Sequence, residues 1–324
     1  MIKIHLLHEP EAEYLDVLKE NLTAPVTLTC GERLNQDVQV LVAGRPKPEH
    51  LQNHPALGTL IIPFAGIPEN TRKLMLQYPH IAVHNLHHNA SATAETALAL
   101  LLGAAKFLVP YDRALRRGDW RPRYQPSRSI LLDGKNALVL GFGEIGRRVA
   151  LGCQGLGMQV KAIHRRPATQ AQRVAGVRSY RPDRLYELLA STHVLVITLP
   201  DTPQTRGMID ESALKRMPPG GILVNVGRGD VIEQEALYRA LKSQHLAAAG
   251  VDVWYNYPDG DEARPHTPPG DFPFHELDNL VMSPHRAGSA RQIERLRMQH
   301  LAELLNAAGR GAPLPNRVSL EAGY

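Results

Sequence analysis

Cysteine is scarce in this sequence: Cys30 and Cys153 are the only two among 324 residues. They show neither metal-ligand spacing nor a partner motif, which argues against a disulfide framework and against a zinc site. A chain with so few thiols is typical of a reducing compartment, so we expect the protein in the cytoplasm.

Long apolar runs are also missing. The longest, Ala97 to Ala105, is far too short to cross a bilayer as a helix. Near the start of the sequence, Lys3 and His5 interrupt the apolar residues, and no signal-like hydrophobic stretch is present. These absences predict no membrane role.

An excess of one charge sign is lacking as well. Lys and Arg number 37 against 32 Asp and Glu, a formal charge of +5, and the isoelectric point is about 9.2. This mild excess suits an anionic small molecule and is weak evidence for nucleic acid. One connection, residues 111 to 135, interleaves Trp120 and Tyr124 with the arginines Arg116, Arg117, Arg121, Arg123 and Arg128. Because no matching stripe occurs elsewhere, we interpret it as a solvated segment packed over the following domain and expect no nucleic-acid partner.

What remains is an ordinary globular composition, 43% hydrophobic and 21% charged, with a length that suggests about two domains. The first part alternates short apolar runs with amphipathic segments, which predicts a small α/β unit with a parallel sheet. Its expected strands are Ile2–Leu7, Pro25–Thr29, Val38–Ala43, Thr59–Ile62 and Ile81–Val83, and its helices are Glu11–Leu22 and Pro68–Gln77.

The second part repeats strand and helix more regularly. Six strands are expected at Ala137–Leu140, Val160–Ile163, His193–Leu199, Gly221–Val226, Ala247–Val253 and Leu280–Met282. Helices are expected between them at Glu144–Leu156, Pro182–Ala190, Asp210–Met217 and Glu233–Lys242. Buried strands with crossovers indicate a doubly wound parallel sheet of the Rossmann type.

Two long helices suggest how the parts connect. Ser91–Val109 has the composition of a helix that leaves one unit for the other, and Ala290–Ala308 is expected to return to the first. We therefore predict a discontinuous substrate domain, residues 1–90 plus 289–324, that is flavodoxin-like, and a dinucleotide-binding domain of residues 91–288.

A glycine-rich turn follows the strand at 137–140. Gly141, Gly143 and Gly146 lie in strand-turn-helix context, where they suit a tight turn, the approach of a pyrophosphate, and close packing of helix on sheet. Glu144 and Ile145 lie at the start of the helix, where their backbone N–H groups can bind the pyrophosphate. This pattern predicts a dinucleotide cofactor.

The next strand ends in His164, Arg165 and Arg166. An NAD site usually has a carboxylate here for the ribose 2′-hydroxyl, whereas two guanidinium groups can pair with a 2′-phosphate. We therefore favour NADP over NAD. In the alternative interpretation the arginines are solvated charges beside an NAD site.

Polar residues follow the remaining strands: Pro200 to Thr205, Asn225 to Gly229, Asp252, and Ser283 to Arg286. Ligands of open α/β sheets bind outside the carboxyl ends of the strands, so these segments are expected to converge. We predict that Pro200, Thr205, Val226 and Asp252 contribute to the cofactor site.

Several motifs together resemble the D-isomer-specific 2-hydroxyacid dehydrogenase family, which includes formate and phosphite dehydrogenases as more distant members. They are Ala94-Glu95, Leu140 to Gly146, Leu199 to Thr205, Gly221 to Gly229, Gly250 to Val253, and Ser283-Pro284-His285. The resemblance implies two Rossmann-like domains, an active site in the cleft between them, and a homodimer formed through the cofactor domain.

By position, Arg228 resembles the family's substrate-binding arginine and His285 its acid-base histidine, while Asp252 resembles the aspartate at the nicotinamide end. Ala65 and Gly66 resemble the backbone donors for the substrate carboxylate. Thr93 is similar to a position that lines the nicotinamide pocket. Their chemistry agrees: a guanidinium and a histidine suit the charge that develops on a 2-keto oxygen, and the cofactor supplies the hydride.

One position departs from the family. Five residues after Asp252, where the family has a glutamate, this chain has Tyr257. A phenol can orient the imidazole but does little to raise its pKa. Glu276 or Asp259 could replace the carboxylate, although nothing in the sequence locates them.

A second cluster, His84, His87 and His88, superficially resembles a metal site. We expect these histidines at the surface or lining the cleft, without metal.

The sequence thus predicts an NAD(P)-dependent oxidoreductase that interconverts a small 2-hydroxy acid and its 2-keto acid, with Tyr257 beside His285. The alternative is a cofactor-binding redox sensor or corepressor-like scaffold with little turnover. Phe64 and the aromatic run Trp254 to Tyr257 hint at an aromatic cleft rim.

Overall fold

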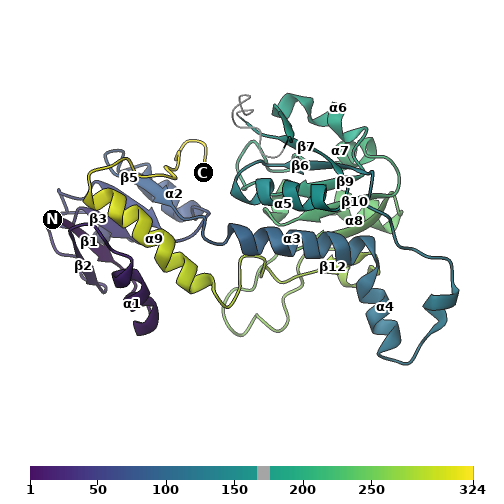
Figure 1. Ribbon diagram of the computed structural model, residues 1–324, viewed down its shortest axis with the longest axis horizontal. Helices are drawn as coiled ribbons and strands as arrows, with labels where there is room; N and C mark the ends of the chain where they lie inside the picture. Colours follow the sequence, from purple (N-terminus) through teal and green to yellow (C-terminus); the bar gives the residue numbers. More distant parts are fainter. Residues whose placement is uncertain (166–175, 324) are drawn as a thin grey trace. The chain divides into compact units, whose positions relative to one another are not determined.

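The computed structural model describes residues 1–165 and 176–323. The chain divides into two compact units, Met1–Asn89 with Ser289–Tyr324, and Ala90–Gly288. Each is built on its own parallel sheet with helices packed against it (Figure 1). The α/β class expected from the alternation of strands and helices is confirmed.

Unit 1 has a five-stranded parallel sheet in the order β2-β1-β3-β4-β5. Its strands are β1 Ile2–Leu6, β2 Val26–Cys30, β3 Val40–Val42, β4 Thr59–Ile62 and β5 Ala82–Asn85. Its α-helices are α1 Ala12–Glu20, α2 Glu69–Met75 and α9 Ile293–Gly309. The strand order is that of flavodoxin-like sheets.

Burial on both faces explains why these strands are nearly all apolar. On one face, α9 lies beside α1 (Figure 1) and packs Leu301 and Leu305 against Ile4 and Ile61. The other face packs against α2. The helix that returns from the end of the chain therefore completes the first core.

Unit 2 has a seven-stranded parallel sheet in the order β12-β11-β10-β9-β6-β7-β8. Its strands are β6 Asn136–Leu140, β7 Gln159–Ile163, β8 Arg178–Tyr180, β9 Val194–Ile197, β10 Gly221–Asn225, β11 Leu246–Val251 and β12 Leu280–Met282. Its α-helices are α3 Ala90–Ala105, α4 Leu108–Leu115, α5 Glu144–Gly155, α6 Leu185–Leu189, α7 Glu211–Arg216 and α8 Gln234–Lys242. The order reverses between β6 and β9, which is the switch point of a Rossmann sheet.

The carboxyl ends of these strands are level. Leu140 pairs with both Ile163 and Ile197, and Asn225 pairs with both Ile197 and Val251. Val251 in turn pairs with Met282 at the end of β12. Every segment that follows one of these strands therefore leaves the sheet at the same edge.

Two expected elements differ from the structure. The single helix expected at 91–109 is wrong: the helix breaks at Phe107, which has a left-handed φ of 50°, and α4 follows. Pro110 explains the break, because it cannot donate to Lys106 and is tolerated only in a first helical turn. The six-strand sheet is also wrong by one strand, because the short, polar edge strand β8 has no apolar run to reveal it.

The basic connection stands away from the body of unit 2 together with α4 (Figure 1). Its aromatic side chains are exposed, Trp120 by 59% and Tyr124 by 80%, so the prediction that this segment packs over the unit is wrong for them. The segment has few apolar residues to bury, and Arg121 pairs with its own neighbour Asp119 at 2.7 Å.

Among the described residues, no single helix is long and apolar enough to cross a membrane. The helices α3 and α4 pass that test only as a pair, bent by 66°.

Candidate active site

A tight turn after β12 carries His285. The His285 backbone N–H donates to the Asp252 carbonyl at 2.8 Å, and the residue adopts a left-handed φ of 55°. The buried Asp252 carboxylate accepts hydrogen bonds from the Ser283 hydroxyl at 2.5 Å and from the N–H groups of Arg286 and Ala287 at 2.9 and 3.0 Å. The aspartate that sequence reasoning assigned to the cofactor site thus has its carboxylate engaged in fixing the histidine turn.

Tyr257 lies against His285. Its hydroxyl oxygen is 2.9 Å from Nδ1 of the imidazole, and the Trp254 backbone N–H donates to the same oxygen at 3.1 Å. The phenol occupies the position expected for a carboxylate. No hydrogen bond joins Glu276 or Asp259 to the imidazole within the described part of the chain, which leaves Tyr257 as its side-chain partner.

The electrostatics of this pair differ from those of a histidine beside a carboxylate. Partial burial lowers the pKa of His285 below its ordinary 6.5, Arg228 lowers it further, and Asp252 acts in the opposite direction. Burial raises the pKa of Tyr257 above its ordinary 10.0. Both groups are therefore neutral at neutral pH.

Arg228 follows β10 and is exposed at the same edge. The Asn225 side chain shapes the backbone around Arg228. The Asn225 amide nitrogen donates to the Arg228 carbonyl at 2.9 Å, and the Asn225 amide oxygen accepts from the Gly227 N–H at 3.0 Å. The Arg228 guanidinium donates to the Gly227 carbonyl at 2.7 Å. Because the charge of Arg228 acts on both Tyr257 and His285, these three residues form one electrostatic site.

The glycine turn has the geometry that its motif predicts. Gly141 has a φ of 100°, and a Cβ on Gly146 would lie 1.9 Å from the Gly141 carbonyl oxygen. A Cβ on Gly143 would meet no atom within 4 Å, so this glycine borders open space at the start of α5. Glu144 pairs with Arg148 at 2.7 Å, which offsets its negative charge there. The turn fits a dinucleotide: the third glycine is required for helix packing and the second leaves room for phosphate.

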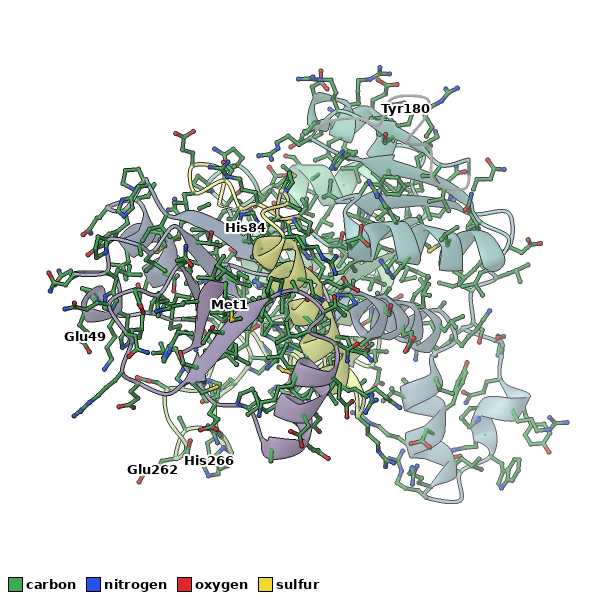
Figure 2. All side chains as sticks on the ribbon, turned by 60° about the vertical axis from the view of Figure 1, so that its left-hand side comes forward. Met1, Glu49, His84, Tyr180, Glu262 and His266 are labelled. Atoms are coloured by element: carbon green, nitrogen blue, oxygen red, sulfur yellow. The ribbon has the colours of Figure 1, made fainter. Side chains whose placement is uncertain are left out.

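The strand β7 ends beside β8. His164 donates its backbone N–H to the Tyr180 carbonyl at 2.9 Å, and Arg165 is exposed next to it. Figure 2 labels Tyr180 at this end of unit 2. Arg166, the other predicted 2′-phosphate ligand, lies outside the described residues.

The other predicted cofactor residues are more buried. Thr205 stabilises its own turn, since its hydroxyl donates to the Pro200 carbonyl at 2.7 Å and accepts from Thr202 N–H at 2.9 Å. Val226, directly after β10, is 6% exposed, and Thr93 in α3 is 5% exposed. In the structure Thr205 is therefore a turn former at the sheet edge.

Unit 1 contains the predicted carboxylate-binding loop after β4. The Asn85 side chain donates to the Ala65 carbonyl at 2.6 Å and so fixes this loop. Among the described residues, no group accepts a hydrogen bond from the N–H of Ala65 or Gly66, and both N–H groups are available to a ligand.

In the histidine cluster, a position at the surface, one of the two expected, does not apply to His84 or His88, whereas His87 is half-buried. His84 and His88 are each 5% exposed. The His84 ring bonds to the Pro315 carbonyl at 2.7 Å, which ties β5 to the segment after α9 (Figure 2). Burial and the nearby Arg297 lower the pKa of His88 to about 4. The described residues contain no group of His, Cys, Asp or Glu that could hold a metal ion.

Comparison with a family model covers most of unit 2. Residues 98–287 match the family described as D-isomer specific 2-hydroxyacid dehydrogenase, NAD binding domain. This chain belongs to that family. The resemblance drawn from its motifs is confirmed.

Family members with similar sequences include two from archaea. The chain is 35% identical over 233 residues to a D-3-phosphoglycerate dehydrogenase of Archaeoglobus fulgidus and 36% identical over 231 residues to a glyoxylate reductase of Korarchaeum cryptofilum. The matches cover 72% and 71% of this chain, and 41% and 66% of the relatives. The match thus spans less than two thirds of these relatives' length.

Solved structures of the family share the fold. A D-isomer specific 2-hydroxyacid dehydrogenase from Xanthobacter autotrophicus Py2, in complex with NADPH and MES, has a TM-score of 0.80 at 24% identity and covers 99% of both chains. An NADPH-dependent glyoxylate/hydroxypyruvate reductase from Sinorhizobium meliloti has a TM-score of 0.79 at 19% identity over 100% of both chains.

Sequence reasoning misjudged the aromatic run of this family member. Trp254 is only 7% exposed and packs edge-on against the buried Phe274, with ring centroids 5.8 Å apart. Tyr255 stacks on the same ring at 6.1 Å. Both side chains anchor the segment to the core, and of this run Tyr257 alone reaches the imidazole. Two adjacent aromatic residues a few positions after a buried strand were the available sign of this anchoring.

Proposed function

We propose that this chain catalyses the NAD(P)-dependent interconversion of a small 2-keto acid and its 2-hydroxy acid. The observation that carries the proposal is the Tyr257 hydroxyl 2.9 Å from His285 Nδ1, beside the arginine that follows β10. A hydrogen-bonded imidazole next to a guanidinium supplies both a proton donor and a positive charge where a carbonyl is reduced.

The residues divide this work. The Arg228 guanidinium binds the substrate's carboxylate and carbonyl oxygens, and the charge that develops on the carbonyl oxygen strengthens that interaction. The His285 Nε2 then donates its proton to this oxygen, while Nδ1–H is donated to the Tyr257 oxygen. In the oxidation, neutral His285 accepts the hydroxyl proton at Nε2, and its Nδ1–H is again donated to the Tyr257 oxygen. The phenol oxygen accepts this hydrogen bond in both protonation states of the imidazole without favouring either by charge, whereas a carboxylate favours the cation.

The glycine turn and the start of α5 would hold the pyrophosphate of a nicotinamide dinucleotide, with Gly143 N–H and its neighbours as donors. When bound, that cofactor supplies the hydride for the reduction and takes it up in the oxidation. Pro200, Val226 and Thr93 are proposed to line its site. We assign the Ala65 and Gly66 N–H groups of unit 1 to the substrate carboxylate.

We further propose that NADP is preferred. Exposed Arg165 and half-buried His164 follow β7, and no carboxylate occupies the position that would repel a 2′-phosphate. NADPH should therefore bind about tenfold or more tightly than NADH, since charge-assisted contacts are worth roughly 1.5–3 kcal/mol. In fluorescence titrations Arg165→Ala should weaken NADPH and leave NADH nearly unchanged. Equal affinities in the parent protein would refute the preference.

A panel of 2-keto acids assayed with NADPH and NADH tests the activity itself. Glyoxylate, pyruvate, hydroxypyruvate and 2-ketobutyrate vary the side chain while keeping the reacting group. Turnover that His285→Ala abolishes would support the proposal. Tight NADPH binding without turnover on any acid would instead favour the cofactor-binding sensor or scaffold.

We also propose that the chain forms a homodimer through α4 and the basic connection at residues 111–135 of unit 2. Leu115, Trp120, Tyr124 and Leu131 are 52%, 59%, 80% and 69% exposed within one short segment. So many large apolar groups in a single exposed segment are typical of an interaction surface. The cytoplasm is its proposed compartment, since neither Cys30 nor Cys153 forms a disulfide.

A further inference from the structure

Trp254 lies where the three segments of the proposed site meet. Its indole Nε1–H donates to the Ser283 carbonyl at 2.8 Å, two residues before His285. Its backbone N–H donates to the Tyr257 hydroxyl at 3.1 Å. A Cβ on Gly229 would lie 2.3 Å from the Trp254 carbonyl oxygen, so the residue after Arg228 packs directly on the same backbone.

The indole joins the segments that follow β11 and β12, at a point beyond the last paired residues of the sheet. The ladder between β11 and β12 ends at the pair Val251 and Met282. Beyond it Asp252 holds the histidine turn through its carbonyl and carboxylate, and the indole adds a second bridge from residue 254 to residue 283. Phe274, which is fully buried, holds the indole ring in place from the core side.

We propose that the Trp254 indole is a positioning residue that fixes the distance between Tyr257 and His285. The proposal rests on the function proposed above. Asp252 fixes the shape of the histidine turn, and Trp254 links that turn to the phenol, because its side chain holds the Ser283 carbonyl while its own main-chain N–H holds the Tyr257 hydroxyl. Loss of the N–H also leaves the Ser283 carbonyl without this donor, which favours movement of the turn.

Removal of the indole N–H alone is the sharpest test. Trp254→Phe keeps an aromatic ring against Phe274 but cannot donate to Ser283. A closer isostere is benzothienylalanine at position 254, in which sulfur replaces the N–H and the bicyclic shape is retained. Both should lower kcat by about tenfold or more, with KM for the keto acid changed less than about twofold, because misplacement of a proton donor affects the reaction more than binding.

The pH profile separates positioning from general stability. When the imidazole moves away from the phenol and gains solvent, the burial that lowers its pKa is relieved, so the pKa governing reduction should rise towards 6.5. Tyr238→Leu is the matched control: Tyr238 is 9% exposed in the same aromatic cluster and contacts Phe274 and Phe272 rather than the site. It should lower Tm without moving the profile.

A double-mutant cycle provides the second readout. In a Tyr257→Phe background, where the hydroxyl is already gone, Trp254→Phe should cost less than half of its effect in the parent chain. Additive effects, or a profile identical to that of the parent, would overturn the positioning role.

The positioning role of Trp254 can also be tested by a measurement that does not depend on catalytic turnover. Titration of the His285 imidazole by NMR, assigned with His285→Gln, should give a higher pKa in the benzothienylalanine protein than in the parent. An unchanged pKa would refute the role of Trp254 even if the chain reduces no keto acid. A changed pKa together with an inactive parent chain would refute only the proposed reaction.

Discussion

A phenol in contact with an imidazole is a weaker electrostatic partner than a carboxylate. Tyr257 stays neutral far above pH 7 because burial raises its pKa, and it gives His285 orientation without charge. Arg228 lowers the pKa of the same imidazole. The pKa of His285, the proposed acid-base group, is therefore shifted below 6.5, in the direction opposite to that of a carboxylate-paired histidine.

Substitution of Tyr257 by glutamate tests this electrostatic difference. Reduction needs the imidazolium, so kcat/KM for a keto acid should fall as pH rises through a pKa below 6.5. In Tyr257→Glu the new carboxylate favours the cation, and the fall should move to higher pH by about one unit or more. The measurement is the pH profile of kcat/KM for both proteins. Superimposable profiles would show that residue 257 does not govern the imidazole.

Arg228 offers a test of geometry rather than charge. Arg228→Lys keeps the positive charge but loses the planar, two-pronged donor that matches a 2-keto carboxylate. We expect kcat/KM to fall by about a hundredfold or more, while NADPH affinity measured by fluorescence stays within about twofold. Near-normal turnover would place Arg228 outside the substrate site.

Much of the fold at the level of elements was predictable from the sequence. Strands β9 and β10 are continuous apolar runs because both sheet faces are covered, and such runs are easily recognised. The polar strand β8 and the break at Phe107 were missed, since edge pairing and a left-handed residue leave no apolar periodicity.

The candidate site was predictable only as far as strand order allowed. That Arg228, Asp252 and His285 gather at one sheet edge follows from their places after parallel strands. That the Asp252 carboxylate binds the histidine turn, or that Trp254 faces the core, depends on side-chain packing across distant segments, which spacing along the chain does not encode.

The glycine turn before α5 makes an element-scale prediction. In Gly146→Ala the new methyl group would meet the Gly141 carbonyl oxygen at 1.9 Å, so helix and strand must separate. We expect a loss of stability of about 1–3 kcal/mol, as for other overpacked sites, together with weaker dinucleotide binding. Gly155→Ala, at the other end of α5 with no atom within 4 Å of its Cβ, is the control. Denaturant unfolding and cofactor titration of both variants check the difference.

At the scale of the whole molecule, the proposed homodimer can be tested by introducing charged side chains into its interface. A chain carrying Leu115→Glu and Tyr124→Glu should become monomeric in sedimentation equilibrium, because the exposed apolar surface would then carry two buried charges on each copy. Leu76→Glu, at a 47% exposed position in unit 1, should leave the assembly unchanged. A parent chain that is already monomeric would remove the proposal.

The interruption of unit 1 by unit 2 has a consequence during synthesis. The Asn306 side chain of α9 accepts hydrogen bonds from the backbone N–H groups of Thr23 and Ala24, a sequence separation of about 280 residues. The first 89 residues therefore emerge from the ribosome with one face of their sheet uncovered, whereas unit 2 is contiguous and can fold as it is made. Until α9 has been synthesised, the apolar side chains of β1 and β3 on that face are open to chaperones, and the docking of α9 is the event that completes the first core.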